Sequence, residues 1–484
     1  MSHTTQRPIQ IESARATEGA SVAAAQEPQE LGPSSLAGLK VHVATYGCQM
    51  NVLDSELVVG GLVDAGSLPV ESADEADVVL YNTCSVRQHA EDRVASQLGR
   101  MQHRCRREPN LIVGIIGCQA QRDGADLLRR FPHVRLVAGT RMFHRIPELV
   151  STLQAQPEQR LIADNTDESV QFRRRVKIRP QWYKAQITVM RGCDHTCTYC
   201  IVPAVRGREV DVPAAEVLEE AKALVDDGVK ELMLLGQNVD SWGRRLEPKQ
   251  NFGDLLALLD KELQPHGLER LFFITSHPSD LKMRILEAMR DCPTVCEYLH
   301  LPAQSGSSRQ LRLMRRGYTR EKYVEIVQKA REYVPSVSIA SDFIVGFPGE
   351  TEEDFEQSKT LIEEVGFTQS FIFKYSPRPG TRASEGMEDD VPEAEKKRRN
   401  NELIEVQLAT QERLNQAKVG TVQQVLCEGP TKRDASRLGG RDRNHQMVVW
   451  PDDGDTHPGE LVWIHVDEAT QLTLKGQRVA APVH

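Results

Sequence analysis

The chain has 484 residues, too many for one ordinary hydrophobic core, and this length predicts about three domains. Its formal net charge of −9 excludes a protein that binds nucleic acid through a global basic field, so any such contact needs local patches. No apolar stretch approaches the roughly twenty residues that span a bilayer, and no membrane partner is expected.

Residues 1–36 are expected to form a disordered tail. They are rich in Ala, Gln, Glu, Ser and Thr, and no basic segment leads into an apolar run as in a signal peptide. We therefore expect a cytoplasmic protein. In that reducing compartment, clustered cysteines indicate metal or redox ligands rather than disulphides.

Residues 38–155 predict a doubly wound parallel α/β domain, with helices expected at 54–65, 89–103 and 123–131. Its apolar runs LKVHVATYGC, ADVVLYNTC and LIVGIIGC each end in a cysteine: Cys48, Cys84 and Cys118. Parallel strands end at one edge of a sheet, where such sheets place ligands. A single cysteine there is commonly a small buried residue. The threefold repetition at equivalent positions instead predicts a three-cysteine iron-sulphur site.

The segment FRRRVKIR, which precedes the central domain, is strongly basic. It contains Arg173, Arg174, Arg175, Lys177 and Arg179. Such a run forms either a solvated linker or a strip that contacts phosphates, and both interpretations stay open.

Residues 180–412 repeat a strand-helix unit six times. Strands are predicted at 186–190, 231–235, 271–275, 298–301, 338–345 and 369–374. Six units are two short of a closed eight-unit barrel, so an open, partial (β/α)6 barrel is expected. Its chemistry should lie at the carboxyl ends of the strands.

The segment RGCDHTCTYC follows the first of these strands directly. Its three cysteines, Cys193, Cys197 and Cys200, fall within eight residues and can hold one side of a four-iron cluster. Three ligands for four irons leave one iron open. An open iron can bind a substrate or cofactor, whereas a cluster closed by four cysteines only relays electrons.

Other predicted strand ends carry the polar or glycine-rich loops LLGQN, ITSHP, LPAQSGS and IVGFPGET. Four such loops around one mouth favour a small charged organic ligand. His277, which precedes a proline, is expected to be a hydrogen-bonded turn residue rather than a metal ligand. Cys105, Cys292, Cys296 and Cys427 lack a full set of nearby partners and are expected to be structural.

Residues 414–480 change to short alternating strands separated by turns, which predicts a small antiparallel β-barrel of the OB type. One loop is basic, with Lys432, Arg433, Arg437, Arg441 and Arg443. Trp450 and Trp463 are nearby in sequence, and basic side chains beside aromatic ones suit contacts with RNA. The alternative is a pair of buried tryptophans beneath a solvated loop.

Along nearly all of residues 38–480 the chain resembles the methylthiotransferase family of radical S-adenosylmethionine (SAM) enzymes. CDHTCTYC matches the family's CxxxCxxC loop, and TYGCQMN, YNTCSVR and GIIGCQAQ match its three N-terminal cysteine motifs. The resemblance implies a methylthiotransferase domain at 38–155, a radical SAM core at 180–412 and a TRAM RNA-binding domain at 414–480.

The resemblance also implies two [4Fe-4S] clusters and SAM as both radical source and methyl donor. Cys193, Cys197 and Cys200 would hold the cluster that binds SAM. The other three cysteines, Cys48, Cys84 and Cys118, would hold a second cluster that delivers the methylated sulphur. The residues expected to line the SAM pocket are Gly236, Gln237, Gln304, Ser305 and Gly346.

Within the family, GQNVDSWG, LHLPAQSGS with LRLMRRGYT, and SDFIVGFPGET look most like the MiaB branch. That branch adds a methylthio group to C2 of N6-isopentenyladenosine at position 37, in the anticodon stem-loop of tRNA. The implied partners are that stem-loop, a flavodoxin or ferredoxin as electron donor, and iron-sulphur repair or carrier proteins, with the chain itself a monomer.

Three alternative functions stay open. Two lie within the family: methylthiolation of threonylcarbamoyladenosine in tRNA, and of a ribosomal-protein aspartate. The third is a non-catalytic iron-sulphur electron carrier that docks on RNA. A carrier is disfavoured because it would close each cluster with a fourth thiolate.

Overall fold

The computed structural model describes residues 10–13, 35–85, 88–164, 179 and 181–482. Most of the expected disordered tail and most of the basic segment FRRRVKIR lie outside these residues. By their contacts, residues 1–180, 191–194 and 201–210 form a first unit, and the remaining residues form a second. Within the described ranges, no helix combines the length and apolar character needed to cross a membrane.

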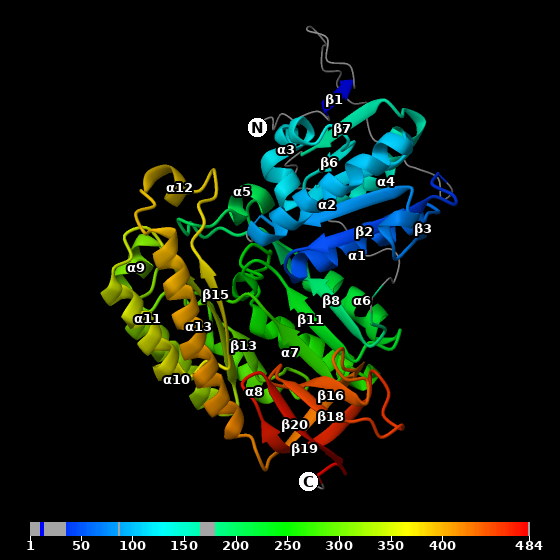
Figure 1. The fold of residues 1–484 in the computed structure, drawn as a ribbon. Helices are drawn as coiled ribbons and strands as arrows, with labels where there is room; N and C mark the ends of the chain where they lie inside the picture. Colours follow the sequence, from blue (N-terminus) through cyan, green and yellow to red (C-terminus); the bar gives the residue numbers. More distant parts are fainter. Residues whose placement is uncertain (1–9, 14–34, 86–87, 165–178, 180, 483–484) are drawn as a thin grey trace. The chain divides into compact units, whose positions relative to one another are not determined.

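The first unit is built on a sheet whose described strands run in the order β1-β7-β6-β5-β4-β2-β3 (Figure 1). All neighbours pair in parallel except β1, which is antiparallel to β7. The strands are β1 Gln10–Ser13, β2 Lys40–Tyr46, β3 Leu68–Pro69, β4 Val78–Thr83, β5 Ile112–Gly117, β6 Leu136–Ala138 and β7 Gln159–Ala163. The strand order reverses between β2 and β4, and sheets of this kind bind ligands at that switch point.

Helices cover both faces of this sheet. They are α1 Gln49–Asp64, α2 Gln88–Arg107, α3 Cys118–Arg130 and α4 Ile146–Ala155, with short 3-10 turns η1 Ala73–Glu75 and η2 Phe143–Arg145. Along β4, Val78 and Leu80 join the core under α1 and α4, whereas Val79 and Tyr81 join the core under α2 and α3. Successive strand residues point to opposite faces, so one apolar strand serves two cores. The predicted doubly wound α/β domain is confirmed.

The second unit contains the six predicted strand-helix units. The strands are β8 Lys184–Thr188, β11 Glu231–Leu235, β12 Arg270–Phe273, β13 Tyr298–His300, β14 Ser338–Val345 and β15 Gln369–Lys374. The helices that follow them are α6 Ala214–Val225, α7 Phe252–Leu263, α8 Met283–Asp291, α9 Ser308–Leu313, α10 Arg320–Tyr333, α11 Glu352–Val365 and α13 Glu393–Gln416. The shorter elements are β9 Met190–Arg191, β10 Val210–Asp211, α5 Val202–Arg206, η3 Val239–Ser241, η4 Gln264–His266 and α12 Arg382–Gly386.

These strands form an open row rather than a closed ring (Figure 1). Strands β8, β11 and β12 pair in parallel, as do β13, β14 and β15, and a parallel bridge between Leu271 and Val295 joins the two halves. One continuous apolar core, which includes the buried Trp242, Phe273 and Phe343, fills the inside. The open, partial (β/α)6 barrel is therefore confirmed.

A small closed barrel ends the chain, in the order β16-β17-β18-β20-β19. Its strands are β16 Val422–Pro430, β17 Arg437–Asp442, β18 Met447–Pro451, β19 Leu461–Ala469 and β20 Thr473–Val479. The prediction of an antiparallel barrel needs one correction, because β18 and β20 pair in parallel. Directions cannot alternate all the way around a ring with an odd number of strands, so at least one pair of neighbours must be parallel.

Hydrogen bonds from buried groups join this barrel to the six-stranded core of the second unit. Arg270, which is fully buried, donates from Nη1 to the carbonyl of Arg441 at 2.6 Å and from Nη2 to that of Gln424 at 2.8 Å. Arg443 forms an ion pair with Glu297 at 2.9 Å. Because a buried guanidinium without acceptors is costly, these contacts fix the barrel on the core.

Candidate functional site

The structure brings Cys48, Cys84 and Cys118 together at the switch point of the first sheet. They follow β2, β4 and β5, which are neighbouring parallel strands. The thiols of Cys48 and Cys84 interact directly, and the charge of Cys48 acts on Cys118. Cys84 and Cys118 are buried and Cys48 is half-buried. The strand order therefore places the three cysteines at one sheltered edge of the sheet.

Two helix starts position these cysteines. Cys48 is the N-cap of α1 and Cys118 is the first residue of α3, so both thiols lie at the positive ends of helices, which favour thiolates. Gly117 precedes Cys118 with a φ of 97°, and a Cβ on it would lie 2.3 Å from Oδ1 of Asn82. Only glycine allows this close approach.

A pair of buried asparagines forms the floor of the site. Asn51 donates from Nδ2 to Oδ1 of Asn82 at 3.0 Å, and Asn82 donates from Nδ2 to the backbone carbonyl of Asn51 at 2.9 Å. Oδ1 of Asn51 also accepts hydrogen bonds from the backbone and the thiol of Cys48. This pair was not predicted from the sequence. Its signal was Asn82 itself, a polar residue inside the otherwise apolar run of β4.

The three thiols differ in acidity. The hydrogen bond with Cys84 is the largest influence on Cys48 and, helped by the charge of Arg206, lowers the pKa of Cys48 to about 6 against the effect of burial. Burial raises the pKa of Cys118, although Arg206 opposes this effect too. Cys48 can therefore ionise near neutral pH, and the guanidinium of Arg206 favours the anionic forms of Cys48 and Cys118.

That guanidinium is itself buried. Arg206, the last residue of α5, donates from Nη2 to Oδ2 of Asp54 at 2.6 Å. Asp54 is on α1 and is fully buried. Among the described residues, Nη1 of Arg206 has no acceptor in hydrogen-bonding geometry, although the guanidinium interacts with the thiol of Cys118. This donor beside the thiols of Cys48 and Cys118 suits an anionic, sulphur-rich group, so the residues fit an iron-sulphur cluster.

The CxxxCxxC cysteines are divided between the two units. Cys193 belongs by its contacts to the first unit, where its backbone N–H donates to the carbonyl of Gly207 at 3.1 Å. Cys197 and Cys200 belong to the second, where the backbone N–H of Cys200 donates to the carbonyl of Cys197 at 3.1 Å. Their spacing in the sequence is what relates the three, and a shared cluster stays a prediction.

A second buried arginine accompanies Cys197. Arg316 donates from Nη1 to Sγ of Cys197 at 3.4 Å. Its other donors reach the hydroxyl of Tyr318 at 3.0 Å and the carbonyl of Pro302 at 3.0 Å. No carboxylate forms an ion pair with it among the described residues, so Arg316 carries an uncompensated positive charge toward this sulphur. Arg316 lies in the segment LRLMRRGYT, which resembles the family, but no role for it was predicted from the sequence.

The residues predicted to line the SAM pocket lie at the carboxyl ends of β11, β13 and β14. They are Gly236, Gln237, Gln304, Ser305 and Gly346. Gln304 is buried with a φ of 71°, unusual for a residue other than glycine, and its backbone bridges to β14. Such strain is common in binding loops. Packing also explains why residue 346 is a glycine, because a Cβ there would lie 2.3 Å from Cγ of Lys396.

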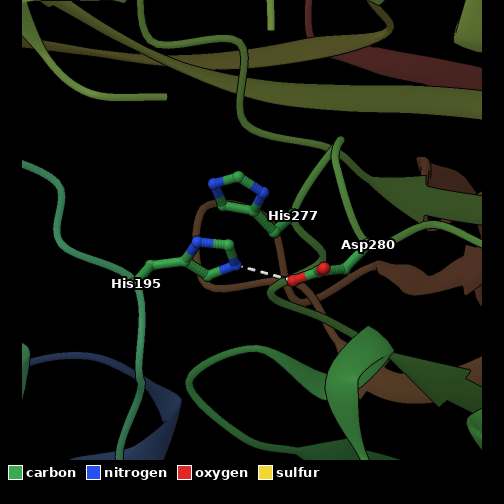
Figure 2. A group of neighbouring side chains, drawn as sticks. All are labelled: His195, His277 and Asp280. Carbon is green, nitrogen blue, oxygen red and sulfur yellow. Dashed lines mark hydrogen bonds and ion pairs between the residues drawn. The ribbon is translucent and has the colours of Figure 1, made fainter. Parts of the chain in front are cut away.

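A polar network missed by the sequence analysis surrounds His195, His277 and Asp280 (Figure 2). The rings of His195 and His277 stack with centroids 3.8 Å apart, and Nε2 of His195 lies 2.6 Å from Oδ2 of Asp280. The same oxygen accepts a hydrogen bond from Asn238 at 2.7 Å, and Arg244 binds the other at 2.5 Å. His195 could have been suspected, since it lies within the CxxxCxxC loop.

Hydrogen bonds occupy most of the polar atoms in this network. Each carboxylate oxygen of Asp280 already has a donor, and Nδ1 of His277 accepts from the backbone N–H of Ser279 at 3.3 Å, whereas Nε2 of His277 has no hydrogen-bond partner among the described residues. Burial, followed by the charge of Arg316, lowers the pKa of His277 to about 2, so this ring is neutral. The prediction that His277 is a turn residue agrees with these contacts.

The pKa values of two carboxyl groups in the network, Asp280 and Asp240, are shifted in opposite directions. Burial alone would raise the pKa of Asp280, but hydrogen bonds from His195, Arg244 and Asn238 outweigh it and lower the pKa. Asp240 is buried without a cation bonded to it, and burial raises its pKa to about 7, against hydrogen bonds from Ser276 and the backbone of His277.

The basic residues of the C-terminal barrel divide into two groups. Lys432 and Arg433 are exposed, and Arg437 is half-exposed beside Asp434. Arg443 is instead committed to Glu297, and Arg441 donates to the carbonyl of His445 at 3.0 Å. Trp450 is buried in the barrel core, whereas Trp463 lines a groove with Arg478. Of the residues expected to contact RNA through this surface, Lys432 and Arg433 are exposed, and Arg437 and Trp463 are partly exposed.

None of the ten cysteines, all of which are described, forms a disulphide. Cys296 and Cys427 are buried, and burial raises the pKa of each. Cys105 and Cys292 are half-buried and pack beside apolar cores. A structural role for all four stays a prediction.

Family models match both cysteine-bearing regions. Residues 187–362 match the Radical SAM superfamily, and residues 40–139 match a family described as uncharacterized protein family UPF0004. The two matches cover the CxxxCxxC loop and the three strand-end cysteines, respectively.

Curated relatives match most of the chain. The tRNA-2-methylthio-N(6)-dimethylallyladenosine synthase of Desulforamulus reducens is 42% identical over 90% of this chain and 95% of its own. The synthase of the same name from Carboxydothermus hydrogenoformans is 41% identical over 90% and 98%. Among solved structures, the radical SAM methyltransferase TsrM from Kitasatospora setae shares the fold with a TM-score of 0.54 and 15% identity, over 72% of this chain and 74% of that one.

Proposed function

The chain belongs to the family of the tRNA-2-methylthio-N(6)-dimethylallyladenosine synthases and is a radical SAM methylthiotransferase, and on this basis we propose that it adds a methylthio group to C2 of N6-isopentenyladenosine at position 37 of tRNA. The observation that carries the proposal is a 42% identity that extends over 90% of the chain. A match of that extent includes parts of the first sheet, the partial barrel and the terminal barrel.

The cofactors in this proposal are SAM and two [4Fe-4S] clusters. Cys48, Cys84 and Cys118 would hold one cluster, and their convergence beside the orphaned Nη1 of Arg206 supports this assignment. The other set, Cys193, Cys197 and Cys200, would hold the cluster that binds SAM. When bound, these groups supply a carbon radical and a methylated sulphur, which acid-base chemistry at an unactivated aromatic carbon cannot provide.

The chain's own residues orient and shelter this chemistry. Arg316 donates from Nη1 to the sulphur of Cys197 and so helps to orient this side chain. His195, fixed by Asp280, holds the middle of the CxxxCxxC loop in one conformation. We assign contacts with SAM to Gly236, Gln237, Gln304, Ser305 and Gly346, because they share the strand ends at which such barrels bind ligands.

We assign tRNA contacts to the exposed Lys432 and Arg433 and to the half-exposed Arg437, with Trp463 as a candidate stacking residue. An anticodon-loop base is already unpaired, so little energy is needed to extrude it. The reducing cytoplasm suits thiolate ligands, and we place the enzyme there as a monomer, served by a flavodoxin or ferredoxin and by iron-sulphur carrier proteins.

Mass spectrometry of tRNA nucleosides from a strain that lacks the gene tests the substrate. The 2-methylthio derivative of isopentenyladenosine should disappear, isopentenyladenosine should accumulate, and the intact chain should restore the product. A complementing Cys197→Ala chain should not. The assignment is wrong if the derivative persists while a methylthiolated threonylcarbamoyladenosine or ribosomal-protein aspartate is lost.

The reaction class has a separate test. Anaerobically reconstituted protein, mixed with SAM and dithionite, should release 5′-deoxyadenosine. Protein that carries iron and sulphide but releases none would be an electron carrier rather than a radical enzyme.

A further inference from the structure

Arg206 is a charged residue removed from water in the interior of the first unit. Its side chain is 5% exposed, and that of its partner Asp54 is 0% exposed. The apolar residues Ile201 and Val205 pack there against Cys118. Burying two charges is expensive, and a purely structural contact would be more stable if apolar side chains replaced the pair.

The pair is also incompletely satisfied. Nη1 of Arg206 and Oδ1 of Asp54 are both buried without a hydrogen-bond partner among the described residues, and the nearest other cation to Oδ1 is Arg191, at 3.9 Å. An unbonded donor on a buried guanidinium costs more than an unbonded neutral group. Such a donor indicates an acceptor that binds in the working enzyme.

The direction of the guanidinium identifies the acceptor by its chemistry. Its charge acts on Cys48 and on Cys118, two of the three thiols at the switch point. Thiolates and inorganic sulphide are anionic acceptors, and hydrogen bonds to sulphur and local charge are known to set the potentials of iron-sulphur clusters. Val205, which precedes Arg206 in α5, packs against Cys118, so Arg206 lies beside the place where the proposed second cluster would be held.

We propose that Arg206, with Asp54 as its counter-charge, sets the reduction potential of the cluster held by Cys48, Cys84 and Cys118. This inference rests on the proposed function, because it requires that cluster. Reduction adds one negative charge to a cluster, and a buried positive charge nearby stabilises the reduced form. Asp54 has the opposite effect. The two residues are positioning residues whose removal should shift the potential in opposite directions.

The test uses the full-length chain in which Cys193, Cys197 and Cys200 are changed to Ala, so that only the N-terminal set can hold a cluster. This parent and its variants are reconstituted anaerobically with ferrous iron and sulphide and titrated under EPR. At the parent's midpoint, Arg206→Gln should lower the ratio of reduced to oxidised cluster at least tenfold, or about 59 mV for one electron. Asp54→Asn should raise that ratio, and Arg206→Lys, which keeps the charge, should change it less than Arg206→Gln does.

Arg104→Gln is the matched control. It removes a partly buried arginine of the same unit, one that donates to the carbonyls of Ala73 and Ala76 at the amino-terminal side of β4. Its potential should equal the parent's.

The inference is overturned if Arg206→Gln leaves the potential unchanged, or if Arg206→Gln and Asp54→Asn shift it in the same direction. Should Arg206→Gln fail to load iron, Asp54→Asn decides alone, and an unchanged or lowered potential rejects the proposal. A parent that binds no cluster at all would instead refute the three-cysteine assignment, and the inference with it.

Discussion

Nε2 of His195 lies 2.6 Å from Oδ2 of Asp280, which ties the middle of the CxxxCxxC loop to the turn after β12 (Figure 2). Asp280→Ala would leave His195, Asn238 and Arg244 without their shared acceptor. Because breaking a buried, charged network leaves unpaired groups, we expect the free energy of unfolding to fall by about 2–4 kcal/mol in urea denaturation. Asp291→Ala, which removes only an exposed pair with Arg290, should leave the urea midpoint unchanged.

The two cysteine sets should be separable in activity. Cys84→Ala removes one of the three strand-end thiols and leaves the CxxxCxxC loop intact. The variant should still release 5′-deoxyadenosine from SAM but form no methylthiolated tRNA, as measured by mass spectrometry. Cys105→Ala, in the same unit but outside the site, should retain both activities. A Cys84→Ala enzyme that still thiolates tRNA would contradict the proposed division of labour.

The raised pKa of Asp240 predicts that the folded protein becomes less stable as the pH rises. Burial raises its pKa to about 7, so the folded protein keeps this carboxyl protonated between about pH 4 and 7 while the unfolded chain loses the proton. The free energy of unfolding should therefore fall through that range, by up to about 4 kcal/mol. In Asp240→Asn this contribution disappears. Thermal midpoints measured at pH 5 and pH 8 should differ less in the variant, and equal differences would contradict the assignment.

Gly117 and Gly99 provide a matched pair of glycines in the first unit. In Gly117→Ala the new Cβ meets Oδ1 of Asn82 at 2.3 Å and the residue must keep a φ of 97°, so we expect a loss of about 2 kcal/mol or more. Gly99 lies within α2 with open space around it, and Gly99→Ala should stabilise the helix by up to about 1 kcal/mol. The two urea midpoints should move in opposite directions.

In the terminal barrel, the exposed basic residues should affect tRNA binding, whereas the paired Arg443 should affect stability. Replacing Lys432 and Arg433 together by Ala should weaken tRNA binding and reduce the slope of log K against log salt by roughly 1–2, as expected for lost phosphate contacts. Arg443→Ala breaks the pair with Glu297, so it should lower the thermal midpoint and leave that slope unchanged. Equal slopes for all three proteins would place the RNA contacts elsewhere.

Parallel topology made much of this molecule predictable. The strand predicted at 338–345 matches β14 residue for residue, and the convergence of Cys48, Cys84 and Cys118 followed from strand direction alone. Helix starts were less accurate. The helices expected from Asp54 and Asp123 begin at Gln49 and Cys118, because a cysteine serves as the N-cap or first residue where the sequence rules expect Ser, Thr, Asp or Asn.

Long-range partners could not be predicted. Arg206 and Asp54 are 152 residues apart, and neither shows in its own segment that the other neutralises it. The basic loop of the barrel showed the same limit. Lys432 and Arg443 look alike in a count of charges, and only the fold shows that one is in water and the other is paired with Glu297.

The two carbonyl acceptors of Arg270 mean that the terminal barrel cannot be trimmed away as an accessory. A shortened enzyme that ends after α13 would leave this guanidinium at the floor of the partial barrel with its main acceptors gone, beside Glu231, 3.7 Å away. Truncation would therefore damage the folding of the part that remains, and a shortened chain that lost activity would reveal nothing about RNA recognition. For this molecule, substitutions on the outer surface of the barrel are the sound route to separating binding from chemistry.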